Sequence, residues 1–249
     1  DWSSDVCSSD LFMPHQFQPV LKFIESTSGR LLIADEVGLG KTIEALYIWK
    51  ELVARENAKR LLLLVPSALK EKWLNDMALY FGIEAEIVDA AGLFKKLTTT
   101  AEFANKHGFV VITSLEGIRY KDVEDFTHPQ APAREKLAEL LERVSSTVTD
   151  KLFDLVIIDE AHYLRNSSTA NYKTGARLRD VSNSLILLSA TPIQTSQENL
   201  FNLMQLMDPE KFYDKRTFEF FIEENHKLVS LANAIRNSEG YSDIEKKLQ

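Results

Sequence analysis

Six short apolar runs are spread along this chain of 249 residues, and helical spacing follows each of them. The runs are RLLIA (30–34), RLLLLV (60–65), AEIVDA (85–90), FVVITS (109–114), LVIID (155–159) and SLILLSA (184–190). Most are rich in leucine and β-branched residues without polar alternation, which is typical of strands that are buried on both faces. The sequence therefore predicts an α/β fold, in which a mainly parallel central sheet is flanked by helices.

Helical patterns between and after these runs predict the domain organisation. Apolar residues recur at i, i+3, i+4 and i+7 in two sets, each marking one face of a helix: Ala45, Ile48, Trp49 and Leu52, then Leu137, Leu140, Leu141 and Val144. The charged segment 121–150 indicates a solvent-facing helical excursion between two strands, and the pattern beyond Pro209 is wholly helical. We predict a sheet domain over residues 12–209 and a helical extension over residues 210–249.

The first eleven residues, DWSSDVCSSDL, differ in character from the rest of the chain. They resemble the translation of a common sequencing-library adapter, and the alternative interpretation is a disordered native terminus. They lack the apolar core of a signal peptide, and neither interpretation gives them a function. The chain has no initiator methionine and stops inside a helical pattern, so we expect it to be a fragment of a longer protein.

Composition excludes several classes of protein. A single cysteine, Cys7, allows neither a disulfide framework nor a Cys/His cluster for zinc. No apolar run approaches the ~20 residues of a membrane-spanning helix, which argues against a membrane role. The net charge is −8, whereas domains that bind nucleic acids are often basic. Any surface for nucleic acid must therefore be local.

The stretch LLIADEVGLGKTIEALYIW (31–49) has the strand, loop and helix context of a phosphate-binding loop. Gly38 and Gly40 would let backbone N–H groups face phosphate oxygens at a helix N-terminus. Lys41 would reach the β and γ phosphates, and the Thr42 hydroxyl would bind magnesium. However, Asp35 stands where the general pattern G-x-x-x-x-G-K-[ST] has glycine, and the alternative is a plain strand-to-helix turn.

A pair of acids follows the apolar run in FDLVIIDEAHYLRN (153–166). Ligands bind at the carboxyl edge of parallel sheets, so Asp159 and Glu160 are candidates for a catalytic site. Asp159 could hold magnesium, while Glu160 could orient and deprotonate the water that attacks the γ-phosphate. The alternatives are two acids that end a strand in solvent and, for His162, an ordinary loop histidine.

A third polar group follows the last run, in LILLSATPIQ (185–194). Ser189 and Thr191 could hydrogen-bond the turn from Asp159 to His162 and so register the γ-phosphate. A simple strand-ending turn is the alternative.

In this order, GLGKT, DEAH and SATP resemble motifs I, II and III of superfamily-two helicases, specifically the Swi/Snf-type translocases. In the bacterial branch that ADEVGLGKTIEA resembles, which includes the RNA-polymerase-associated recycling ATPase, an acid at the first glycine position is usual. The resemblance covers roughly residues 12–220. Other matching stretches are MPHQFQPVLKFI (13–24, with Gln16 as the adenine-reading glutamine), LLLLVPSALKEKW (61–73, motif Ia), VVITSLEGIR (110–119, motif Ib) and SATPIQTSQENLFNLMQLMDPEKF (189–212).

The resemblance implies the first RecA-like lobe of a two-lobed motor that uses ATP and Mg²⁺. Its nucleotide contacts would be Gln16, Asp35, Glu36, Val37, Gly38, Leu39, Gly40, Lys41 and Thr42. A second lobe would supply an arginine finger, so the fragment alone should hydrolyse ATP hardly at all. Catalysis would depend on Lys41, Asp159 and Glu160, magnesium binding on Thr42 and Asp159, and coupling to the phosphate on His162, Ser189 and Thr191.

The same resemblance implies double-stranded DNA as a partner. Contacts to the phosphate backbone of one strand would come from motifs Ia and Ib, at Pro66, Ser67, Lys72, Thr113 and Ser114. For Lys72 and Trp73 the alternative is a solvated charge and a core aromatic. A nuclease, a methyltransferase or RNA polymerase are further candidate partners, and a bacterial cytoplasmic location is expected. The rival functions are a strand-separating helicase or nuclease-linked motor, and a nucleotide-gated scaffold that does not hydrolyse.

Overall fold

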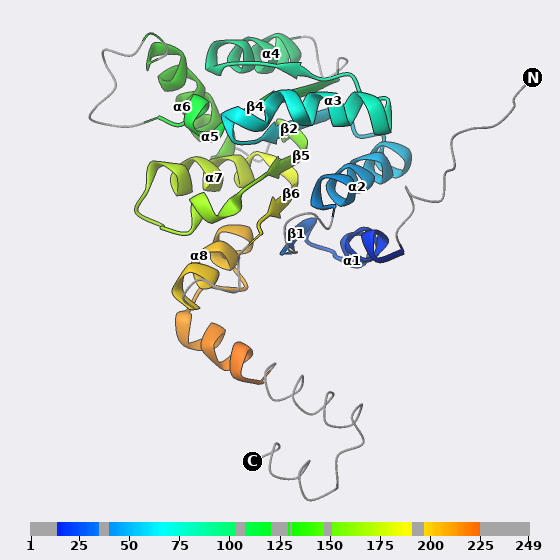
Figure 1. The fold of residues 1–249 in the computed structure, drawn as a ribbon. Coiled ribbons are helices and arrows are strands. Elements are labelled where there is room, and N and C mark those ends of the chain that lie inside the picture. The colour runs from blue at the N-terminus through cyan, green and yellow to red at the C-terminus, as the bar shows by residue number, and fades with distance from the viewer. Residues whose placement is uncertain are drawn as a thin grey trace, which may run out of the picture.

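The computed structural model describes residues 14–34, 40–102, 108–120, 129, 131–146, 151–190 and 197–224. In this part of the chain a central sheet lies between two layers of helices (Figure 1). The lead-in (1–11) lies outside the described residues, as do the loop residues 35–39, Thr191 and residues 225–249.

Every apolar run contributes a strand to one six-stranded sheet, whose order is β1-β6-β5-β2-β4-β3. All five strand pairs are parallel, which confirms the predicted α/β class. The strands are β1 (Arg30–Ile33), β2 (Arg60–Leu64), β3 (Glu86–Ile87), β4 (Phe109–Thr113), β5 (Phe153–Ile158) and β6 (Ser182–Leu188).

The register aligns the carboxyl ends of five strands. Ile33 pairs with Leu188, Leu64 with Ile158, and Leu64 also with Thr113. The segments that follow β1, β2, β4, β5 and β6 therefore leave the sheet at one edge, which we call the carboxyl edge.

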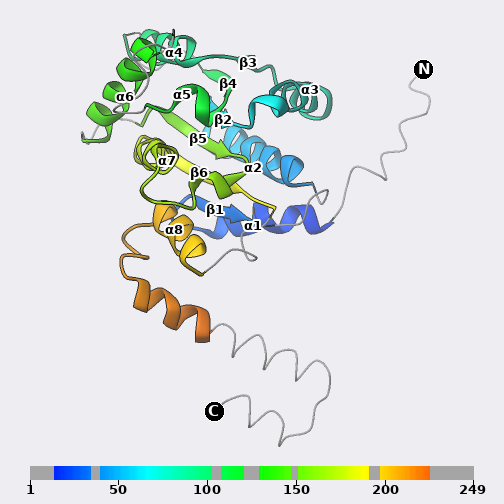
Figure 2. The ribbon, with the colours of Figure 1, turned by 60° about the vertical axis from the view of Figure 1, so that its left-hand side comes forward.

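Two apolar clusters, one on each face of the sheet, hold the helices. Leu61 and Leu63 of β2 belong to the cluster under α1 (Gln18–Glu25), α2 (Lys41–Glu56) and α3 (Lys70–Phe81). Leu62 and Leu64 face the opposite cluster, because successive side chains of a strand alternate between its faces. Five helices contribute side chains to that second cluster: α4 (Ala90–Glu102), α5 (Leu115–Ile118), α6 (Ala131–Ser145), α7 (Ala170–Asp180) and α8 (Gln197–Met207). Figure 2 shows the two layers from the side.

Both predicted amphipathic helices form. The first set of apolar residues is buried in α2, and Leu137, Leu140 and Leu141 of the second are buried in α6. Within the segment 121–150, α6 is therefore not simply solvent-facing, because its apolar face belongs to one of the two core clusters.

Residues 215–224 are helical, and Phe218 of this segment packs against Phe201 of α8 with ring centroids 5.4 Å apart. The boundary between a sheet domain and a helical extension remains a prediction. Among the described residues, no helix is both long and apolar enough to span a membrane.

Candidate functional site

The segment after β1 leads directly into the N-terminus of α2. Gly40 is the residue before the helix, with φ 97°, a left-handed conformation that favours glycine. Lys41 and Thr42 are the first two residues of α2, and both are half-buried. A helix N-terminus at the carboxyl edge is a suitable site for an anion, since its first N–H groups have no partner within the helix.

Gln16 lies against Gly40. It belongs to the short 3₁₀ helix η2 (Pro14–Phe17), and a Cβ atom on Gly40 would collide with its side-chain amide. The ring of the adjacent Phe17 packs on Tyr47 of α2, with centroids 4.8 Å apart. The structure thus brings the predicted adenine-reading residue to the end of the predicted phosphate loop.

The acid pair begins where β5 ends. The backbone N–H of Asp159 donates to the carbonyl oxygen of Leu64 at 2.8 Å, which continues the pairing of β5 with β2. The two carboxylate oxygens of Asp159 accept from different donors: Oδ1 from the backbone N–H of Glu160 at 2.8 Å, and Oδ2 from Nε1 of Trp73 at 3.0 Å. The orientation of this carboxylate is therefore determined by two separate parts of the chain.

Burial is the main cause of a raised pKa at Asp159, and the neighbouring charge of Glu160 adds to it. The hydrogen bonds from Trp73 and Glu160, and the positive charge of Lys41, act in the opposite direction. Lys41, in the first turn of α2, therefore lies near enough to the end of β5 for its charge to act on Asp159. Lys41 and the acid pair, far apart in the sequence, meet at the carboxyl edge, where the ends of β1, β6 and β5 are aligned.

Glu160 has a strained backbone and an ionisable neighbour. Its φ of 52° is left-handed, which is uncommon for a residue other than glycine and often marks a functional turn. His162, in η4 (Ala161–Leu164), places Nδ1 2.9 Å from Oε2 of Glu160. That separation suits an ion pair when the imidazole is protonated, although Nδ1 makes no hydrogen bond of acceptable geometry.

Ser189 follows β6, which lies between β1 and β5 in the sheet. Its side chain is buried, and its backbone N–H donates to the carbonyl oxygen of Ile33 at 3.0 Å. Ser189 is thus fixed at the carboxyl edge beside the end of β1, while its predicted companion Thr191 lies outside the described residues.

The predicted DNA contacts separate into two groups. Ser67 and Lys72 are exposed and Pro66 is half-buried, around the start of α3. Thr113 and Ser114 are buried, at 0% and 2% exposure. The hydroxyl of Ser114 accepts from the N–H of Gly117 at 3.2 Å and so caps α5. Contact of these last two residues with a DNA strand stays a prediction, and in this structure their side chains are buried next to Gly117 of α5.

A model of the SNF2-related domain matches residues 15–248. The chain belongs to the SNF2-related family. Membership confirms the predicted Swi/Snf-type identification, and with it a family of ATP-dependent, helicase-like motors.

The curated relatives of the SNF2-related chain include bacterial proteins. An uncharacterized ATP-dependent helicase, YqhH, of Bacillus subtilis (strain 168) is 33% identical over 207 residues, covering 83% of this chain and 31% of YqhH. The RNA polymerase-associated protein RapA of Haemophilus influenzae (strain PittEE) is 32% identical over 238 residues, covering 94% of this chain and 23% of RapA. The chain thus spans about a third or less of the length of these relatives.

Two solved structures share the fold. The SWI2/SNF2 ATPase core of Sulfolobus solfataricus, solved in complex with double-stranded DNA, aligns with a TM-score of 0.55 at 16% identity, covering 94% of this chain and 42% of that one. The Hef helicase domain of Pyrococcus furiosus aligns with a TM-score of 0.53 at 14% identity, covering 80% and 37%. At these identities the likeness supports the fold, a RecA-like lobe.

The oxygen ligands that Thr42 and Asp159 offer at the carboxyl edge of the sheet suit Mg²⁺. This ion usually takes one or two carboxylates and completes its shell with water and substrate phosphates. Thr42 and Asp159 offer one hydroxyl and one carboxylate, and the burial of Asp159 favours a nearby cation. Among the described residues no group of three or more His, Cys, Asp or Glu side chains could hold a metal by itself.

The sequence analysis did not predict the hydrogen bond that Trp73 makes to Asp159 at this edge. The sequence allowed it to be a core aromatic, and it is indeed buried at 2% exposure. Its hydrogen bond to Asp159 joins residues 86 positions apart. No sequence signal indicated that contact.

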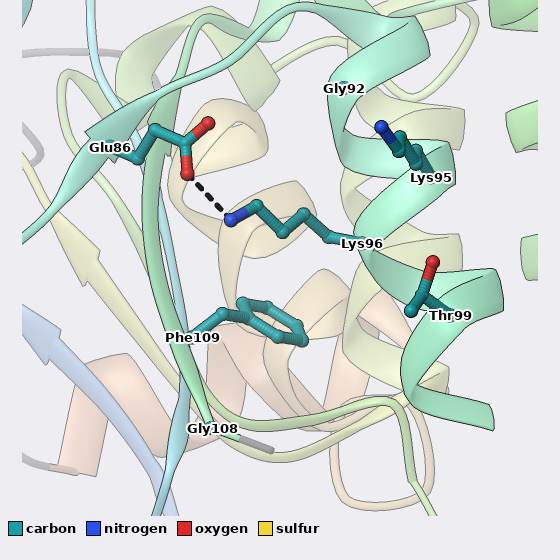
Figure 3. A pocket seen from close by; sticks show the side chains of 7 residues that line it. All are labelled: Glu86, Gly92, Lys95, Lys96, Thr99, Gly108 and Phe109. Carbon is teal, nitrogen blue, oxygen red and sulfur yellow. Dashed lines mark ion pairs between the residues drawn. The ribbon is translucent and has the colours of Figure 1, made fainter. Parts of the chain in front are cut away.

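A separate hollow of about 420 Å³ lies away from the carboxyl edge. Glu86 and Gly108 line it near the starts of β3 and β4, opposite Lys95 and Lys96 of α4 (Figure 3). Lys96 forms an ion pair with Glu86 at 2.5 Å. This hollow lies near the start of β4 rather than at the carboxyl edge, and it is not part of the candidate site.

Proposed function

We propose that this chain is the first motor lobe of an ATP-dependent DNA translocase and that ATP with Mg²⁺ binds at its carboxyl edge. One observation carries the proposal: the sheet register brings the ends of β1 and β5 to the same edge, because Ile33 pairs with Leu188 and Ile158 with Leu187. Lys41, at the start of α2, lies near enough to Asp159 there for its charge to lower the pKa of that carboxyl. Phosphoryl transfer in P-loop enzymes depends on a phosphate loop and a metal-holding acid that meet at one place.

Each group at the carboxyl edge has a role in the proposed reaction. The N–H groups of residues 35–40 and of the first turn of α2 bind phosphate oxygens, and the Lys41 ammonium neutralises the β and γ phosphates. Thr42 and Asp159 hold Mg²⁺, which when bound supplies positive charge to the phosphates. Glu160 orients and deprotonates the attacking water. A protonated His162 would pair with the carboxylate of Glu160 and so compete with the attacking water for it. This contact supports a role for His162 in coupling the acid pair to the γ-phosphate.

Gln16 is proposed to recognise adenine, and its contact with Gly40 supplies a test. Gly40→Ala should lower the free energy of unfolding by about 1 to 2 kcal/mol, because a left-handed φ disfavours a Cβ atom. The Cβ would also push the flexible amide of Gln16 aside, so the preference for ATP over GTP should fall. Urea unfolding and competition binding measure the two effects.

Gly82→Ala is the matched control for this substitution. Gly82 ends α3 with φ 59°, and a Cβ there would meet nothing within 4 Å. A similar loss of stability with an unchanged preference for ATP is expected. Equal loss of base preference in both variants would contradict the role of Gln16.

Duplex DNA is proposed to bind through the exposed residues around the start of α3, Ser67 and Lys72, with the adjoining Pro66. Backbone contacts of this kind position DNA without reading its sequence, which is compatible with an acidic chain. The complex of the Sulfolobus SWI2/SNF2 core with double-stranded DNA supports this choice of partner.

A second RecA-like lobe is proposed to complete the site with an arginine finger. Such an arginine accelerates related phosphoryl transfers by about 10³ to 10⁵, so this lobe alone should turn over very slowly. RNA polymerase is a candidate partner because RapA is an RNA polymerase-associated protein. A nuclease or a methyltransferase is proposed as an alternative partner. The proposed location is the bacterial cytoplasm.

Translocation is tested by comparing triplex displacement with duplex unwinding, using the natural polypeptide that carries this sequence. Displacement of the third strand without separation of the duplex is the expected result. Duplex separation without triplex displacement would favour the strand-separating helicase. A nucleotide-gated scaffold would bind nucleotide and show neither activity. The presence of Glu160 beside Asp159 argues against a scaffold, because a scaffold needs no base for an attacking water.

A further inference from the structure

Trp73 connects α3 to the acid pair. Its indole is buried in the apolar cluster beneath α1, α2 and α3, with 2% exposure. Its N–H donates to Oδ2 of Asp159 at 3.0 Å. A buried indole N–H usually requires a partner, and here the partner is the carboxylate proposed to hold Mg²⁺.

The geometry leaves Asp159 able to bind a metal while its orientation is restricted. Oδ1 accepts the N–H of Glu160 and Oδ2 accepts the N–H of Trp73. Each carboxylate oxygen can accept a second interaction, so a cation can still approach. Partners that orient a ligand in this way are worth about 10- to 100-fold in metal affinity or activity.

The position of Trp73 in α3 adds a second consequence. Lys72, the preceding residue, is exposed, and Ser67 lies in η3 (Ser67–Leu69), which leads directly into α3. The helix whose exposed side carries one proposed DNA contact, Lys72, thus carries on its buried side the donor to Asp159. A shift of α3 on binding DNA would change the Trp73–Asp159 hydrogen bond directly.

We propose that Trp73 is a positioning residue for Asp159, and that it links the placement of α3 on DNA to the binding of Mg²⁺ with nucleotide. The inference rests on the proposed function, since it requires Asp159 to hold the metal. It assigns to Trp73 a role beyond packing.

The first test measures the affinity of the natural polypeptide for AMP-PNP, by calorimetry, in EDTA and in Mg²⁺. Trp73→Phe keeps an aromatic ring but removes the N–H donor. Its affinity in EDTA should equal that of the wild type, whereas its affinity in Mg²⁺ should fall about 10-fold. Trp49→Phe, at a buried tryptophan of α2 in the same cluster, should match the wild type in both conditions.

The second test measures the link to DNA. In the wild type, Mg²⁺ with AMP-PNP should change the affinity for a DNA duplex, because coupling between two sites is reciprocal. That change should shrink at least several-fold in Trp73→Phe and remain in Trp49→Phe. Wild-type behaviour of Trp73→Phe in both tests would overturn the inference, even if the wild type hydrolyses ATP. Absence of nucleotide binding by the wild type would instead contradict the proposed function.

A measurement without a variant protects against misfolding of Trp73→Phe. The indole ¹⁵N–¹H signal of Trp73 should shift when Mg²⁺ is added to the complex with AMP-PNP, while the signal of Trp49 should not. Sequential NMR assignment of the wild type identifies both signals. An unchanged Trp73 signal would overturn the positioning role.

Discussion

Glu160→Gln is expected to abolish DNA-stimulated ATP hydrolysis in the natural polypeptide while nucleotide binding is retained. The amide has almost the same shape as the carboxylate but cannot accept the proton of the attacking water. General-base catalysis contributes about 10² to 10⁴ in rate, so kcat should fall by at least 100-fold. A phosphate-release assay with saturating duplex DNA measures the rate, and calorimetry with AMP-PNP measures binding.

Glu51→Gln is a suitable control for loss of a carboxylate. Glu51 lies in α2 and pairs with Arg55 at 2.6 Å on the helix surface, where such pairs contribute little. Its kcat should match that of the wild type. Turnover of Glu160→Gln at the wild-type rate would refute the role given to Glu160 and would revive the interpretation of the acid pair as a solvated strand end.

Lys41→Ala should weaken nucleotide binding itself, by about 100-fold or roughly 2.7 kcal/mol. The substitution removes the positive charge proposed to face the phosphates. It also removes the attraction that Lys41 exerts on the carboxylate of Asp159. Both effects change the complex with nucleotide before any hydrolysis. Calorimetry with AMP-PNP in Mg²⁺ should therefore detect the loss of affinity directly.

Lys50→Ala tests whether the effect is specific to the position. Lys50 lies in the same helix and is exposed, with its ammonium donating to the carbonyl oxygen of Phe81 at 3.3 Å. Its substitution should leave nucleotide affinity unchanged. Equal affinity of Lys41→Ala and the wild type would count against the phosphate loop.

Glu160→Gln and Lys41→Ala together separate the proposed motor from a scaffold. A scaffold would lose binding in Lys41→Ala but would show no hydrolysis for Glu160→Gln to abolish. A motor should respond to both substitutions in different assays. The pair therefore distinguishes whether the carboxyl edge only binds ATP or also hydrolyses it.

Local sequence patterns predicted most of the elements. The run of leucines in β2 is buried on both faces, as its lack of alternation indicated. The run AEIVDA contributes only two residues to β3 before α4 begins at Ala90. This run is less uniformly apolar than the others, and among the described strands β3 stands at the end of the order, paired with β4.

The burial of Thr113 and Ser114 was not predictable from their motif. Both follow an apolar run at the carboxyl edge, as Asp159 does, and the resemblance suggested contact with DNA. The difference arises because α5 begins at Leu115, directly after β4, with Ser114 as its N-cap and Gly117 close to both hydroxyls. Whether a polar residue at a strand end is exposed depends on the path of the next segment.

The sequence by itself determined the α/β class, the order of the motifs and the residue types suited to phosphate and metal, because strand runs, helical spacing and loop composition are local properties. Only the tertiary structure decided that β6 separates β1 from β5, that Lys41 acts on Asp159, and that Trp73 donates to Asp159. These relations join residues distant along the chain. They depend on strand order and on the packing of helices against the sheet, which the periodicities of strands and helices do not encode.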